Sequence, residues 1–61
     1  MAQKASILIV DDDANLRTTM SLILRRKGYL VTTASDGREA IEEVTQRPFL
    51  VIFVDSRMPG M

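Results

Sequence analysis

Two short apolar runs, each ended by aspartate, are the feature that most constrains how this chain of 61 residues can fold. The first covers Ser6 to Val10 and is followed by three aspartates, and the second covers Phe49 to Val54 and is followed by Asp55. The first run does not alternate with polar residues, which is typical of a strand buried on both faces of a parallel sheet. The second is the most apolar stretch of the chain, and we expect it to be a strand as well.

The segment between 14 and 27 carries a helical pattern. Its apolar residues fall at helical spacing and form one apolar stripe, made by Leu16, Met20, Ile23 and Leu24. Asp13 precedes the stripe as a good N-cap, and Gly28 follows it as a common helix stop. We therefore expect a helix over residues 14–27.

The middle of the chain predicts one more strand and one more helix. Residues 29–34 are mixed enough in polarity to form an edge strand. A helix is expected at about residues 36–46, with a narrow apolar face made by Ala40, Ile41 and Val44. Pro48 cannot continue that helix, because its ring removes a backbone donor and clashes with the preceding turn.

The expected order is strand, helix, strand, helix, strand, which is a β-α-β-α-β arrangement of the α/β class. Right-handed crossovers place the three strands side by side and parallel, with the first strand in the middle and the order 2-1-3. Residues 1–61 leave room for one domain.

Composition excludes several classes of function. Eight basic and eight acidic residues give a net charge of zero, so we expect no electrostatic attraction to nucleic acid or to an anionic membrane. No apolar run approaches the ~20 residues that span a bilayer, and no signal peptide is recognisable. Cysteine is absent, which fits a reducing compartment, and we expect a cytoplasmic protein.

The aspartates that end the two apolar runs suggest a site. Parallel strands ~4.8 Å apart would bring Asp11, Asp12 and Asp55 to the same edge of the sheet, where open α/β sheets bind ligands. Carboxylates at ~4 Å repel by ~4 kcal/mol at an effective dielectric of ~20, and Mg²⁺, which prefers oxygen ligands, would relieve that repulsion. Because an aspartate after a strand is most often a turn former or a helix cap, the spacing alone leaves both interpretations open.

The motifs now described resemble the response-regulator receiver family of two-component signalling, which has a flavodoxin-like fold. They are I-L-I-V-D-D-D, A-S-D-G-x-E-A-I and V-I-F-V-D-S-R-M-P-G-M, and the resemblance runs from about Ala5 to Met61. It implies that Asp55 accepts phosphate from a sensor histidine kinase or a phosphotransfer protein. It also implies a Mg²⁺ site formed by Asp11, Asp12, Asp55 and the backbone carbonyl of Arg57.

The sequence departs from that family in its length, since it resembles only the N-terminal half of a receiver. The Ser or Thr and the Lys that the family carries on later strands are missing, so impaired phosphotransfer is expected. The strand at 49–54 becomes a sheet edge, which predicts a homodimer or a higher self-associated form that completes the fold. Two alternatives are a self-pairing interaction module without phosphotransfer and a haloacid-dehalogenase-like phosphatase, in which Asp11 and Asp13 would form the catalytic pair.

Overall fold

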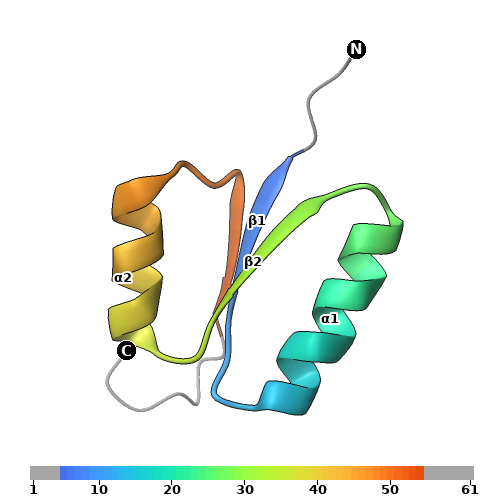
Figure 1. Ribbon diagram of the computed structural model, residues 1–61, viewed down its shortest axis with the longest axis horizontal. Helices are drawn as coiled ribbons and strands as arrows, with labels where there is room; N and C mark the ends of the chain where they lie inside the picture. The colour runs from blue at the N-terminus through green and yellow to red at the C-terminus, as the bar shows by residue number, and fades with distance from the viewer. Residues whose placement is uncertain (1–4, 55–61) are drawn as a thin grey trace.

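In the computed structural model, which describes residues 5–54, strands and helices alternate along the chain (Figure 1). The order is β-α-β-α-β, as expected from the sequence. The elements are β1 (Ser6–Val10), α1 (Ala14–Arg26), β2 (Leu30–Ala34), α2 (Gly37–Gln46) and β3 (Val51–Val54).

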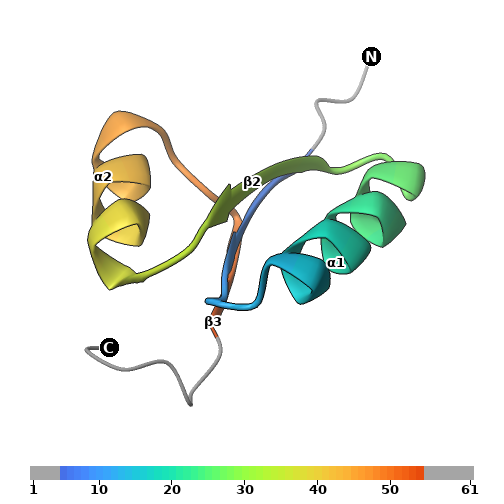
Figure 2. The ribbon, with the colours of Figure 1, turned by 60° about the horizontal axis from the view of Figure 1, so that its bottom comes forward.

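The three strands form one parallel sheet with β1 in the middle. The order is β2-β1-β3, which confirms the predicted topology. In the register, Val10 at the end of β1 is paired with Ala34 of β2 and with Val54 of β3. The two helices lie on opposite faces of the sheet, as Figures 1 and 2 show from two directions.

The core is centred on β1. The side chains from Ile7 to Val10 are buried, as predicted for a strand covered on both faces. Ala34 and Ala40 complete the buried apolar set, and Phe49 packs against it. A central strand with a helix on each side therefore carries the small core of this chain.

The ends of α1 are formed by local hydrogen bonds that the sequence predicted. Asp13 Oδ1 accepts from the backbone N–H groups of Asn15 (2.9 Å) and Leu16 (3.2 Å), which is an N-cap. Gly28 has a φ of +96°, the left-handed conformation that glycine adopts without the steric cost of a Cβ atom.

Several predicted boundaries were wrong by one or two residues. The first helix ends at Arg26 because Lys27 is its C-cap, and the second begins at Gly37 because Asp36 is its N-cap. Tyr29 is not part of β2, since its N–H donates to Leu24 O (3.2 Å) at the end of the helix. In β3, pairing begins at Val51, two residues after the predicted start.

The apolar stripe of α1 is only partly covered by the sheet. Leu16 and Ile23 are 39% and 50% exposed, whereas Met20 and Leu24 are half-buried and Ser21 is buried. The helix directs the side that carries Met20, Ser21 and Leu24 toward β1 and β2. Half of the stripe therefore faces outward.

The side of the molecule around β3 is the least covered. All four residues of β3 are between 39% and 46% exposed. On α2, Ile41 is 64% exposed, so the predicted apolar face of that helix is buried only at Ala40. A groove of about 620 Å³ runs between α2 and the β1–β3 pair, with Leu8, Val10, Ile52 and Val54 on its floor.

Candidate functional site

The predicted site lies at the carboxyl edge of the sheet. Val10 and Val54 are register partners, so β1 and β3 end at the same level. Asp11 directly follows β1, and Asp55 directly follows Val54 in the sequence. Asp55 and Arg57 lie outside the described residues, and their predicted roles therefore remain predictions.

Asp11 is held tightly at this edge. The residue is only 6% exposed, and its N–H donates to Ala34 O at 3.1 Å. Its Oδ1 accepts from the N–H of Asp13 at 2.9 Å, and its carbonyl oxygen accepts from Arg17 at 2.6 Å. The bonds to Ala34 and from Arg17 hold the main chain of Asp11 in place, and the bond from the Asp13 N–H gives its buried carboxylate one hydrogen-bond partner.

The two aspartates that follow have different environments. Asp12 is exposed. Asp13 uses Oδ1 to cap α1 and is therefore committed to the helix start. Among the three consecutive acids, Asp11 and Asp12 remain as the pair that could serve a ligand.

The chemistry of this pair fits a hard divalent cation. Carboxylate oxygens are the ligands that Mg²⁺ prefers, and one or two of them suffice because the ion keeps several waters. Between residues 5 and 54, no group of three acidic, histidine or cysteine side chains lies close enough to hold a metal. The third acid that the sequence predicts for the site is Asp55.

Arg17 is a residue that the sequence analysis missed. Its guanidinium reaches from α1 to the carbonyl of Asp11 and so ties the helix to the end of β1. A signal was present in the sequence, since an arginine in the first turns of a helix opposes the helix dipole and needs a compensating acceptor. For Arg17, the backbone carbonyl of Asp11 is that acceptor.

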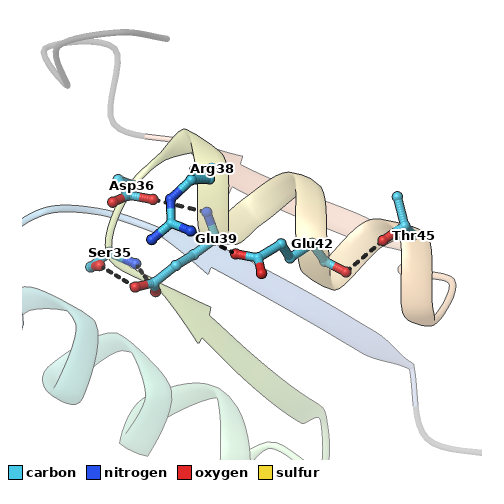
Figure 3. Close-up of polar contacts among 6 residues, drawn as sticks. All are labelled: Ser35, Asp36, Arg38, Glu39, Glu42 and Thr45. Carbon is cyan, nitrogen blue, oxygen red and sulfur yellow. Dashed lines mark hydrogen bonds and ion pairs between the residues drawn. The ribbon is translucent and has the colours of Figure 1, made fainter.

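A second polar cluster lies at the same edge, where β2 leads into α2 (Figure 3). Glu39 accepts from the N–H of Ser35 at 3.0 Å and from its hydroxyl at 2.9 Å. The N–H of Glu39 donates to Asp36 Oδ1 at 2.8 Å. The hydrogen bond from the Ser35 N–H, with that from its hydroxyl, lowers the pKa of Glu39 from its ordinary value of 4.5. The cluster fixes the β2–α2 connection next to the candidate site.

Within residues 5–54, no helix is long and apolar enough to cross a membrane.

Comparisons with known proteins agree with this fold. Residues 7–61 match the family described as "Response regulator receiver domain". The chain is 44% identical to "Transcriptional regulatory protein ZraR" of Escherichia coli O157:H7 over 90% of its length and 12% of that protein. It is 43% identical to "Probable transcriptional regulator ycf27" of Guillardia theta over 95% of its length and 23% of that protein.

A solved structure is similar over nearly the whole chain. It is the chemotaxis response regulator CheY4 of Vibrio cholerae, with a TM-score of 0.92 and 42% sequence identity. The match covers 97% of this chain and 49% of that one. The chain therefore spans about half of this solved structure and a smaller part of the curated relatives.

Proposed function

Because the chain belongs to the family of response regulator receiver domains, we propose that Asp55 accepts a phosphoryl group in a two-component phosphorelay. Receiver domains are regulatory domains rather than conventional enzymes. The donor would be the phosphohistidine of a sensor histidine kinase or of a phosphotransfer protein in the cytoplasm. In the transfer, the bond from phosphorus to the imidazole nitrogen breaks and a bond to an Asp55 carboxylate oxygen forms.

The observation that carries this proposal is the register between β1 and β3. Val10 and Val54 are paired, and neighbouring strands lie ~4.8 Å apart. The two strands therefore end at one edge of the sheet, where Asp11 follows β1 and where we propose that Asp55, the next residue in the sequence after β3, also lies. That edge is where open α/β sheets bind their ligands.

Mg²⁺ is the cofactor that this proposal includes. Asp11, Asp12, Asp55 and the backbone carbonyl of Arg57 would hold it. When bound, the ion would neutralise part of the negative charge of the incoming phosphoryl group. The contacts from Asp13 and Arg17 support the proposal because they hold Asp11 in place at the edge.

Phosphorylation of the 61-residue chain by a small acyl-phosphate donor tests the proposal. We expect intact-mass spectrometry to detect one added phosphoryl group when Mg²⁺ is present, at a slow rate since the Ser or Thr and the Lys that the resemblance implies are missing. Asp55→Asn should abolish the added mass. Asp36→Asn is the matched control, because asparagine also caps helices and α2 is retained. Labelling that persists in Asp55→Asn would contradict the assignment.

The response of thermal stability to Mg²⁺ separates this proposal from a pure interaction module. A ligand at 100 times its Kd stabilises the folded state by about 2.7 kcal/mol, so Mg²⁺ should raise the Tm. Asp12→Asn should remove that rise, and Asp36→Asn should retain it. A Tm that does not respond to Mg²⁺ would favour a self-pairing module without phosphotransfer.

The exposed strand β3 supports a second proposal for this chain, which is self-association. Its four residues are between 39% and 46% exposed, and the strand is an edge of the sheet. Edge strands of this kind pair readily with other chains. We propose a homodimer, or a higher form, that uses β3 and the adjoining groove, and we propose that this segment itself contacts neither nucleic acid nor membranes.

A further inference from the structure

The outer edge of β2 is open to another strand. In the order β2-β1-β3, β1 is the one strand paired with β2 among residues 5–54. The Leu30 N–H donates inward to Ala5 O, and Ala34 O accepts from Asp11 N–H, so the even-numbered residues face β1. Alternate residues of a parallel strand direct their main-chain groups to opposite sides. Val31 and Thr33 therefore direct theirs outward.

Two cavities along this edge are lined by arginine. One of about 280 Å³ lies between α1 and β2 and includes Arg17 and Arg25. The other, of about 450 Å³, lies at the start of β2 and includes Arg25 and Arg47. No acidic side chain of the described part of the chain lines either cavity. Arg47 forms an ion pair with Glu43 at 3.7 Å. The unbalanced positive charge beside these cavities therefore comes from Arg17 and Arg25 on α1.

Two of the three arginines of α1 are held at separate positions along the edge. Arg17 donates to Asp11 O, which is level with the end of β2, and Arg25 donates to Val31 O at 3.3 Å. At ~3.3 Å per residue along a strand, these anchor points are roughly 10–13 Å apart. A single small anion cannot bridge such a distance. An extended peptide can, because its residues i and i+4 are ~13 Å apart and lie on the same face.

The wall of the first cavity also contains a hydroxyl without a partner. Ser21 is 6% exposed, and its Oγ makes no hydrogen bond within residues 5–54. Buried polar groups are nearly always hydrogen-bonded, so this one calls for an explanation. A polar ligand in the cavity would provide the missing partner.

We propose that the β2 edge binds an extended acidic segment of a partner protein, added as a further strand. Carboxylates at positions i and i+4 of the bound peptide would form ion pairs with Arg17 and Arg25, on the side of the sheet that α1 covers. The peptide backbone would form hydrogen bonds with Val31 and Thr33. Arg25 would then give up its hydrogen bond to Val31 O and pair with a peptide carboxylate. The carbonyl oxygen of Val31 would become free to accept a hydrogen bond from the added strand. This surface adjoins the candidate phosphoacceptor site, because Arg17 also donates to the carbonyl of Asp11, but it needs no phosphate on Asp55, and it lies at the opposite edge of the sheet from β3.

A peptide titration of the isotope-labelled 61-residue chain, followed by NMR, tests the proposal. The probe has seven residues, with glutamate at its second and sixth positions and alternating valine and threonine elsewhere. We expect the largest amide shifts at Val31 and Thr33. A peptide of the same composition, with glutamate at the second and fifth positions, places its acids on opposite faces and should bind more weakly.

Two single-charge variants give the matched comparison. Arg25→Gln should weaken binding of the first peptide about three- to fivefold, as the loss of an exposed ion pair predicts. Arg26→Gln removes the same charge from the next residue, which lines neither cavity, and should leave the affinity unchanged within error. Equal binding of the two peptides, equal effects of the two variants, shifts centred on β3, or no binding would each overturn the proposal.

Discussion

At the scale of single residues, three consecutive aspartates have three different environments. Asp11 is buried and held by main-chain partners, Asp12 is exposed, and Asp13 caps a helix. The differences come from position, because the strand ends at Asp11 and the helix starts just after Asp13. Neighbouring residues of one type can therefore be tested separately.

Replacement of the capping residue should cost stability. Asp13→Ala leaves the N–H groups of Asn15 and Leu16 without their acceptor, so we expect a loss of about 0.5–2 kcal/mol in the free energy of unfolding. Urea denaturation in the absence of Mg²⁺ measures it. Asp12→Ala is the control and should change stability by less than about 0.5 kcal/mol, as exposed positions usually do. Equal losses in the two variants would contradict this assignment of the cap.

At the scale of elements, α2 is tied to β2 by a reciprocal set of hydrogen bonds. Asp36 accepts from the N–H of Glu39, and Glu39 accepts from both polar groups of Ser35 (Figure 3). The ionised carboxylate of Glu39 is the better acceptor, and its lowered pKa follows from these bonds. The stability of this connection is therefore linked to pH.

The linkage predicts a loss of stability in acid that depends on Glu39. Its pKa is lowered on folding, so its contribution is complete above the ordinary value of 4.5 and is lost as the pH falls through the folded pKa. Glu39→Gln should flatten this part of the curve of unfolding free energy against pH. Glu42→Gln, which removes an exposed contact of 3.7 Å with Arg38, should retain it. Identical curves for the wild type and Glu39→Gln would exclude the linkage.

The elements themselves could be predicted from local sequence, and their ends only approximately. Asp13 and Gly28 marked the limits of α1 well because caps act through neighbouring backbone groups. The start of β3 was placed two residues early, since Phe49 is apolar but packs against the core from outside the strand. The apolar character of Phe49 therefore indicated that it packs in the core, but it did not indicate whether the residue belongs to the strand.

At the scale of the whole molecule, a small core is combined with much exposed apolar surface. Helices cover both faces over β1, but the groove between α2 and β3 stays open. Full burial of a valine, isoleucine or phenylalanine side chain contributes ~1.5–3 kcal/mol, and β3 obtains only part of that. A second chain that covers this side would supply the remainder.

Self-association should therefore depend on the open groove. We expect sedimentation velocity at micromolar concentrations to detect dimers or larger species of the 61-residue chain. Ile41→Lys, at an exposed position that lines the groove, should shift the distribution toward monomer. Leu22→Lys is the control, because that side chain is exposed on α1 at the other face of the sheet. A folded wild-type monomer at these concentrations would refute the proposal.

Sequence alone determined the alternation of strands and helices, the parallel order 2-1-3 and the N-cap and glycine stop of α1, because these follow from local patterns and from the handedness of the connections. Tertiary structure decided which sides of the elements are covered. It placed Ser21 rather than Leu16 and Ile23 against the sheet, bound Arg17 to Asp11, and gathered arginines beside β2. Those outcomes depend on contacts between different elements of the fold, and local residue patterns do not determine which side of each helix the sheet covers.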